Sequence, residues 1–428
     1  MTPGGRNIKT ACMKLIHTAD WHLGNTFHGH ARWDEFRHFL DWLLDVLRQR
    51  RPDALIVSGD IFDSANPPAA AEQLLYDFLL RATSELKGLQ VVLTAGNHDS
   101  AGRLEAPAQL LRCHNVYVRS LIHRDEATDE PDFDYYMLPL SARTSDEAEV
   151  VCFALPYLRP CDYPAGLSVA EGIAWYLDNL CRRLRKSDFR GLPVVVAAHF
   201  YAAGAEVCES EHSERLVVGG QDCVSAGSVD CGAAYTALGH IHKAQRVAGV
   251  DSEMYYAGSA LPMSFSEKSY RHSVQWVEID GSGRAEVSRI DYAPLRGLMS
   301  IPAKGAAQPD EVFDAIAALP RREKGDDGSS WPYLEIRVLE KEPQPSLMHN
   351  VTEALADRAV HFCRMVREVP PSHRESDRIA SLESLRHLSP IEMAQRVFQS
   401  RYDAPMPDEM RQRFDEAAKA VLDAPAEE

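Results

Sequence analysis

Short apolar runs alternate with longer amphipathic stretches over the first 260 or so residues. Five runs have the length and composition of buried β-strands: 14–18, 54–58, 90–94, 193–198 and 235–239. Between the first two, apolar residues from Phe36 to Leu47 recur at helical spacing with charged residues between them. Further strands are indicated at 116–120, 133–140 and 151–158. The alternation predicts an α/β fold from Lys14 to about Leu261.

The pattern becomes β-rich after about Ser264, and we expect a small module to begin there. Residues 273–280 and 284–292 flank a turn of Asp, Gly, Ser and Gly, which predicts a β-hairpin. A helix at 311–319, a strand at 333–339, a helix at 347–358 and a strand at 362–369 are predicted next. Residues 370–378 then have the composition of a linker, and 379–422 the pattern of a helical tail interrupted by prolines.

The composition is that of a globular protein. The chain has 428 residues, of which 45% are hydrophobic and 25% charged, and its longest apolar runs are too short to span a bilayer. The first twelve residues lack the apolar segment of a secretory signal. Nine cysteines occur without C-x-x-C pairs, which indicates reduced thiols and a cytoplasmic location.

The net charge argues against binding of nucleic acid by bulk electrostatics. Lys and Arg number 46 against 63 Asp and Glu, a formal charge of -17. If the substrate is a nucleic acid, then bound divalent cations, a local basic face or a partner protein must attract it. The sequence does not choose among these three.

Polar clusters directly follow the five strongest strands. Because ligands of open α/β sheets gather beyond the carboxyl ends of the strands, residues far apart in the sequence can meet there. The clusters contain carboxylates, imidazoles and one amide but no thiolate, a set that suits two divalent cations such as manganese, iron or zinc. Their members are Asp20 and His22; Asp60 and Asp63; Asn97, His98 and Asp99; His199; and His240 and His242.

The spacing within the clusters supports a shared metal site. Asp20 with His22, and His240 with His242, are two residues apart, so each pair can face one site in extended chain. The two carboxylate oxygens of Asp60 could bridge two metals. Two divalent ions would leave such a site positively charged, which favours an anionic phosphodiester as substrate.

The ordered set D-x-H, G-D-x-x-D, G-N-H-D, a lone His and G-H-x-H resembles the calcineurin-like metallophosphoesterase superfamily. Within it, the segments MKLIHTADWHLG, SGDIFDSANPP, AGNHDS and LSPIEMAQRVF are similar to the SbcD family, the nuclease subunits of bacterial SbcCD complexes. The resemblance covers nearly everything from Met13 on. It implies a four-layer α/β/β/α nuclease domain.

The resemblance also implies a role for each motif residue. One metal would be held by Asp20, His22, Asp60 and His242, and the other by Asp60, Asn97, His199 and His240. His98 would be left to face the scissile phosphate as the catalytic residue. Archaeal relatives carry a second such histidine where this chain has Asp63, which leaves the role of Asp63 open.

The activity that the resemblance implies is DNA hydrolysis by a two-metal-ion mechanism in recombination, replication and repair. The family acts as a 3′ to 5′ exonuclease on duplex ends and as an endonuclease at hairpins or blocked ends, with Mn²⁺ preferred to Mg²⁺. The sequence contains no G-x-x-x-x-G-K-[ST], so an SbcC-type coiled-coil ATPase would supply ATP binding. We expect a homodimer within a heterotetramer.

The tail is the expected docking element for that ATPase. Two helical segments, 388–402 and 407–422, carry an apolar stripe that suits a partner's groove but could also pack on its own domain. We therefore divide the chain into a disordered extension (1–12), a nuclease domain (13–285), an α+β capping domain (286–372) and a linker with a helical partner-binding tail (373–428).

Several residues keep two interpretations. Asp63 and Asp99 could be hydrogen-bond partners of the ligands, turn residues or participants in the chemistry. Arg103 and His28 are candidate DNA contacts but could simply be solvated. His17 lies inside a strand and is expected to be a packed core residue.

Two other functions are compatible with the same motifs. One is a small-molecule phosphodiesterase or phosphatase, although the chain lacks the Arg-Gly that follows G-D-x-x-D in protein phosphatases and has Asp99 where they carry Glu. The other is a non-catalytic scaffold that binds DNA ends, although every expected metal ligand is present. Turnover of a small phosphodiester compared with duplex DNA would separate the enzyme alternatives.

Overall fold

The computed structural model describes residues 13–203, 205, 224–340, 342, 344–368, 389–402 and 404–414. The expected extension at 1–12 and the expected linker lie outside these residues. The chain forms two compact units, Met1–Gly297 and Leu298–Glu428. The first unit thus extends past residue 285, where the nuclease domain was expected to end.

The first unit contains two six-stranded sheets. The first sheet has the order β16 (Ala285–Asp291), β15 (Ser273–Ile279), β1 (Met13–Thr18), β4 (Ala54–Ser58), β5 (Gln90–Thr94) and β6 (Val116–Arg119). Its strands β1, β4, β5 and β6 are parallel, and β15 of the hairpin β15–β16 runs antiparallel to β1. The predicted hairpin is therefore confirmed, but the expectation that it opens a separate module is wrong, because it completes this sheet.

The second sheet contains the remaining long strands of the unit. Its order is β13 (Gln245–Arg246), β14 (Met254–Tyr256), β12 (Tyr235–Gly239), β9 (Val194–His199), β8 (Ala148–Ala154) and β7 (Met137–Ser141). The inner strands are parallel, and β7 and β13 are antiparallel edges. Two short pairs, β2 (Thr26–Phe27) with β3 (His30–Ala31) and β10 (Ala202–Ala203) with β11 (Val224–Ser225), lie in loops.

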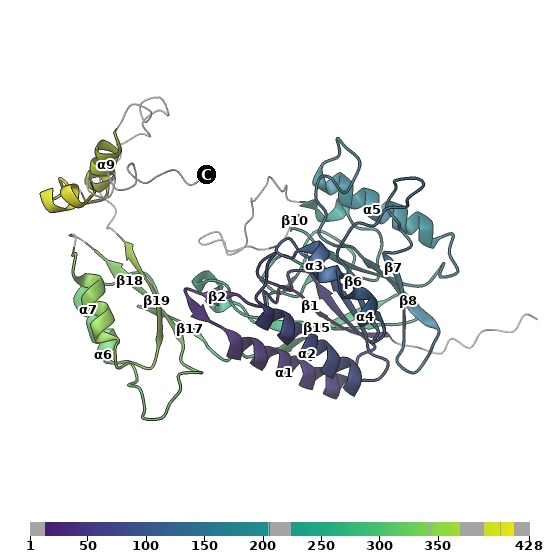
Figure 1. The fold of residues 1–428 in the computed structure, drawn as a ribbon, viewed down its shortest axis with the longest axis horizontal. Coiled ribbons are helices and arrows are strands. Elements are labelled where there is room, and N and C mark those ends of the chain that lie inside the picture. The colour runs from purple at the N-terminus through teal and green to yellow at the C-terminus, as the bar shows by residue number, and fades with distance from the viewer. Residues whose placement is uncertain are drawn as a thin grey trace, which may run out of the picture. The chain divides into compact units, whose positions relative to one another are not determined.

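Helices cover the outer faces of both sheets (Figure 1). The helices α1 (Trp33–Arg50), α2 (Ala69–Glu85), α3 (Ala101–Glu105) and α4 (Ala108–Arg112) share a core with the first sheet. The helix α5 (Val169–Leu184) shares another with the second sheet. Two 3₁₀ turns, η1 (Ala226–Ser228) and η2 (Phe265–Ser269), complete the unit.

Successive apolar side chains of a strand point to opposite faces of its sheet, and this explains the layers. In β4, Leu55 and Val57 pack toward the helices, whereas Ala54 and Ile56 enter a core shared by both sheets. These strands are buried on both faces, as expected of parallel sheets, and each large apolar side chain contributes roughly 1.5–3 kcal/mol to folding. The four-layer α/β/β/α prediction is confirmed.

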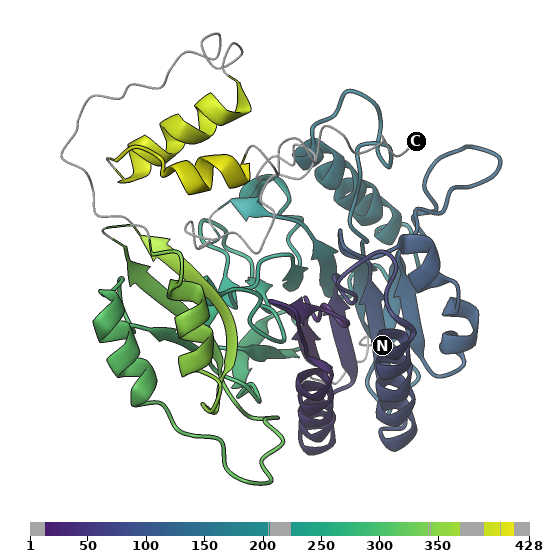
Figure 2. The same ribbon diagram turned by 60° about the vertical axis from the view of Figure 1, so that its left-hand side comes forward.

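The second unit is a small parallel α/β module. Its elements are β17 (Leu298–Ile301), α6 (Pro309–Ala317), β18 (Tyr333–Leu339), α7 (Leu347–Ala354) and β19 (His361–Glu368). The strands form one parallel sheet in that order, and both helices pack on the same face (Figure 2). The opposite face carries ion pairs such as Arg337 with Glu368.

Part of the predicted tail lies within the described residues. The helix α9 (Pro390–Tyr402) falls on the first predicted tail segment, and residues 408–414 are helical within the second. The remainder of that segment lies outside the described residues. None of the described helices is both long and apolar enough to cross a membrane.

Candidate metal centre

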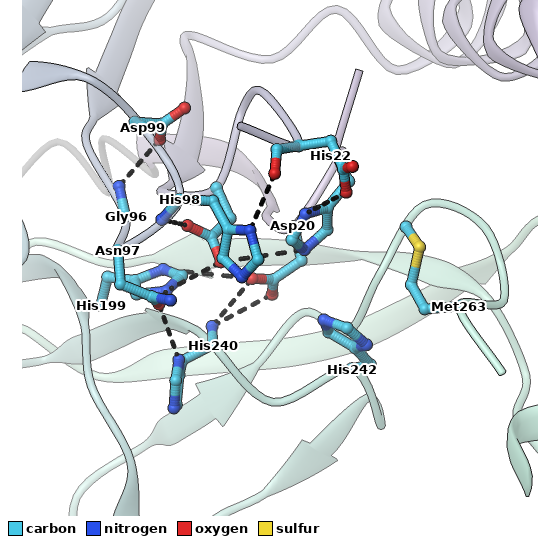
Figure 3. Close-up of polar contacts among 12 residues, drawn as sticks. Asp20, His22, Gly96, Asn97, His98, Asp99, His199, His240, His242 and Met263 are labelled. Carbon is cyan, nitrogen blue, oxygen red and sulfur yellow. Dashed lines mark hydrogen bonds and ion pairs between the residues drawn. The ribbon is translucent and has the colours of Figure 1, made fainter. Parts of the chain in front are cut away.

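The loops after five parallel strands converge at one end of the first unit. Strands β1, β4 and β5 of the first sheet and β9 and β12 of the second end there. Their loops bring together the side chains that the motifs singled out, which point toward one another (Figure 3). The contact between the two sheets therefore creates the site.

One set of donors comes from the loops after β1 and β12. Asp20, His22 and His242 have ligand atoms within 4.8 Å of one another and side chains that are almost fully buried. Within the described part of the chain, neither ring nitrogen of His22 has a hydrogen-bond partner. Buried polar atoms without partners are costly, and a bound cation would satisfy them. These donors fit a divalent metal ion.

A second set lies beside the first. Asp60, His199 and His240 also have ligand atoms within 4.8 Å of one another. The amide oxygen of Asn97 lies 3.0 Å from Nε2 of His199 and 3.1 Å from Nδ1 of His240. Carboxylate, amide and imidazole donors at this separation fit a second cation.

Asp60 touches both sets. Its Oδ2 lies 3.8 Å from Nε2 of His22, in the first set, and 3.4 Å from Nε2 of His199, in the second. Its Oδ1 accepts the backbone N–H of His98 at 2.9 Å. The carboxylate therefore lies between the two donor sets and could serve both.

The backbone is held in unfavourable conformations at this site. Asp20, His22, Asp60 and His240 all have positive φ, at 51°, 47°, 48° and 100°. Such conformations are uncommon outside glycine and gather at functional sites, where surrounding contacts enforce them. One of these contacts is the hydrogen bond from the N–H of His22 to the carbonyl of Asp60, at 3.0 Å.

Burial and neighbouring charges shift the pKa values of two residues in the site. Burial raises the pKa of Asp20. Burial lowers the pKa of His199, but the carboxylates of Asp60 and Asp20 outweigh it and raise that pKa to about 9. Histidine must lose its proton to bind a metal, so a cation and a proton would compete for this ring.

His98 lies beside the first set, with a ring nitrogen within 4.8 Å of ligand atoms of His22 and Asp63. Its Nδ1 lies 2.9 Å from the backbone carbonyl of Asp63, which can only accept a hydrogen bond, so Nδ1 carries the hydrogen. The ring packs edge-on against His22, with centroids 4.9 Å apart. In the neutral ring, Nε2 is then free to accept a proton.

Asp63 contacts a predicted metal ligand. Its Oδ1 accepts a hydrogen bond from Asn25 at 3.0 Å and lies 3.4 Å from Nδ1 of His22. Burial alone would raise its pKa, but the contact with His22 outweighs it and lowers the pKa below the usual range. The side chain is thus placed to orient His22.

Asp99 ties two of the loops together. It accepts backbone N–H groups from Ile61 at 3.1 Å, Phe62 at 2.9 Å and Gly96 at 2.9 Å. Burial and the neighbouring charge of Asp60 raise its pKa to about 6. Of the interpretations left open by the sequence, the contacts favour a hydrogen-bonding role.

The sequence motifs did not single out Glu267. It lies in η2, is 1% exposed, and places Oε1 3.2 Å from Nδ1 of His242. Its Oε2 accepts the N–H of Met263 at 2.8 Å. No spacing rule connects Glu267 with His242, so only the folded structure shows the contact.

The two candidate DNA contacts lie outside the donor sets. Arg103 donates to Asn66 at 2.9 Å and lies 3.6 Å from Glu72, with a half-exposed side chain. His28 is exposed, and its ring contacts Phe27. Both stay predictions.

Comparison with known proteins gives the class. The model of the calcineurin-like phosphoesterases matches residues 13–244, and that of the type 5 capsule protein repressor C-terminal domain matches residues 294–402. The chain belongs to the calcineurin-like phosphoesterase family.

Similar proteins that carry a name define the subgroup of phosphoesterases to which the chain belongs. The SbcD subunit of the SbcCD nuclease from Rhodobacter capsulatus is 35% identical over 76% of this chain and 80% of its own length. The SbcD protein of Bacillus subtilis is 30% identical over 96% and 98%, and that of Escherichia coli K12 is 31% identical over 60% and 62%. Within the phosphoesterases the chain is thus a member of the SbcD family of metal-dependent nucleases.

Proposed function

We propose that this chain hydrolyses DNA phosphodiesters with two divalent metal ions, as the nuclease component of an SbcCD-type complex. One observation carries the proposal: two buried donor sets meet at a shared carboxylate, Asp60. Such an arrangement suits displacement at phosphorus, where two metal ions can stabilise both the attacking and the leaving oxygen.

Asp20, His22, Asp60 and His242 would hold one ion, and Asp60, Asn97, His199 and His240 the other. The bound cations would neutralise the phosphodiester and supply Lewis acidity. Mn²⁺ is the proposed ion because imidazole, amide and carboxylate donors are mixed, with Mg²⁺ as the less suitable alternative.

His98 is the proposed catalytic residue. Because its Nδ1 is engaged by the carbonyl of Asp63, Nε2 is the nitrogen that can face the phosphate. In the protonated ring, Nε2 would donate to a phosphoryl or leaving oxygen, a role that accounts for a histidine outside both donor sets.

The substrate and partner follow from family membership. The relatives are named as one component of the SbcCD nuclease, so we propose an SbcC-type ATPase as partner and DNA ends and hairpins as substrates. The exposed apolar side chain of Val397 on α9 supports docking through the tail. A homodimer within a heterotetramer and a cytoplasmic location belong to the same proposal.

The test is degradation of an end-labelled linear duplex by the purified chain with its SbcC-type partner and ATP. We expect label to be lost from 3′ ends in Mn²⁺ and retained with chelator. Intact duplex together with rapid turnover of a small chromogenic phosphodiester would instead support a small-molecule phosphodiesterase. If neither substrate turns over, the chain is a scaffold.

A further inference from the structure

We infer that Glu267 is a positioning residue that orients His242 and strengthens metal binding at one of the two sites only. The inference rests on the proposed two-metal function and adds that the two sites bind their metal ions with unequal affinity. It starts from the contact between Oε1 of Glu267 and Nδ1 of His242, at 3.2 Å.

The carboxylate is firmly placed. Glu267 is 1% exposed, and its second oxygen accepts the backbone N–H of Met263 at 2.8 Å. The two oxygens therefore have different partners, one just before η2 and one on the loop after β12. A buried carboxylate held at both oxygens cannot rotate away from the ring it contacts.

This contact determines which nitrogen of His242 can bind a metal. An ionised carboxylate only accepts hydrogen bonds, so Nδ1 of His242 carries the hydrogen and Nε2 carries the lone pair. Carboxylates that accept from a ligating histidine fix the ring orientation and raise its basicity. Losing such a partner typically costs roughly 10–100-fold in metal affinity.

In the other donor set, one of the two histidines, His199, is held by a neutral acceptor instead. Nδ1 of His199 lies 2.9 Å from the carbonyl oxygen of Ser58. The fourth donor of that set is the neutral amide of Asn97, whereas the first set includes the carboxylate of Asp20. The site of Asp20, His22 and His242 should therefore bind its cation more tightly than its neighbour.

The experiment is a calorimetric titration of the full-length chain with Mn²⁺ after removal of metals by chelator. We expect two ions per wild-type chain, with one site tighter than the other. In Glu267→Gln, which keeps the shape but removes the charge, the tight site should weaken by about tenfold or more and the second site by less than about twofold.

Glu105→Gln is the matched control. Glu105 is another nearly buried glutamate that contacts a histidine, His123, with Oε1 and Nε2 2.5 Å apart, and it belongs to neither donor set. The same chemical change there should leave both Mn²⁺ affinities unchanged. Thermal melting in chelator checks that each variant folds.

The possible results distinguish failure of the role inferred for Glu267 from failure of the proposed two-metal function. Equal weakening of both sites in Glu267→Gln, or no weakening of either, overturns the positioning role while the two-metal site stands. Two equally tight sites in the wild type overturn the inequality, even if the variant does not fold. Fewer than two ions in the wild type overturns the proposed function itself, and the inference with it.

Discussion

At the scale of single residues, Asp60 is the side chain that contacts both donor sets. Removing its carboxylate in Asp60→Ala should abolish binding of two Mn²⁺ ions and lower DNA cleavage on the order of 10²–10³-fold or more, because both cations lose a ligand. Metal analysis of the purified variant, with a cleavage assay, measures both effects. Two bound ions in the variant would contradict the bridging role.

His98 should behave differently because it belongs to neither proposed ligand set. In His98→Leu, two Mn²⁺ ions should remain bound, while cleavage falls by about 10²–10⁴-fold through loss of proton transfer. Metal stoichiometry and single-turnover cleavage measure the two properties separately. Cleavage at the wild-type rate would remove His98 from the chemistry.

His17 tests the electrostatics of the core. It is fully buried, its Nδ1 lies 2.8 Å from the hydroxyl of Tyr235, and burial lowers its pKa to about 3. The folded state therefore prefers the neutral ring, so protonation of His17 opposes folding. The part of the free energy of unfolding that depends on the neutral ring is fully present above the unfolded pKa of about 6.5 and is lost as pH falls toward 3. Lowering the pH from 8 to 5 should therefore reduce the free energy of unfolding by about 2 kcal/mol through His17 alone.

The measurement for His17 is denaturant unfolding in chelator at both pH values. His17→Gln cannot titrate in this range, so the part of the pH dependence that His17 causes should disappear from that variant. Identical pH dependence in the two proteins would show that His17 does not contribute.

The sequence identified site residues that belong to a motif better than site residues whose role depends on a tertiary contact. The seven expected ligands could be named because their order and spacing resemble those of a family. The structure brings all seven side chains together, and their binding of metal stays a prediction. Glu267 and the threefold contact of Asp99 could not be found in this way. Their partners lie in other loops, so they depend on tertiary distances that no local pattern contains.

At the scale of elements, the loops of the site depend on a glycine that permits close approach. A Cβ atom on Gly96 would lie 2.1 Å from Oδ1 of Asp60 and 2.3 Å from its backbone nitrogen. Gly96→Ala should therefore displace the Asp60 loop and weaken Mn²⁺ binding at both sites by about tenfold or more.

Gly102→Ala is the matched control because a Cβ atom there meets nothing within 4 Å. This glycine lies in α3, so the control should leave metal binding unchanged and stabilise the helix by roughly 0.5–1 kcal/mol. Calorimetric Mn²⁺ titration compares the two variants. Unchanged binding in Gly96→Ala would show that the loops tolerate the added atom.

Elements were predicted well where the pattern is local. The strands β1, β4, β5, β9 and β12 and the helix α1 lie where apolar spacing indicated. The hairpin β15–β16 was also found, but not its sheet, because the pairing of Met13 with Ile279 joins opposite ends of the unit. Strand pairing at that distance depends on which edge remains free, which spacing alone does not encode.

At the scale of the whole molecule, the net charge of -17 remains to be reconciled with a DNA substrate. Every proposed ligand lies in the first unit, where two bound cations would offset the negative charge of the surrounding carboxylates. A local cation pair supplies little long-range attraction, however, because charges are screened within about 8–10 Å at physiological salt. A partner that binds DNA would supply the rest, and the tail is the proposed docking element for it.

The exposed apolar side chain of Val397 on α9 allows the contribution of the tail to be measured. It is 58% exposed, and a charge there would be buried without a partner in any apolar interface. Val397→Asp should weaken association with the SbcC-type ATPase by about tenfold or more, with Mn²⁺ binding unchanged. Gln399→Glu, a charge at another exposed position of α9, should bind normally. If both variants bind the ATPase as the wild type does, the tail helix is not the docking element, and the partner must contact another surface of the chain.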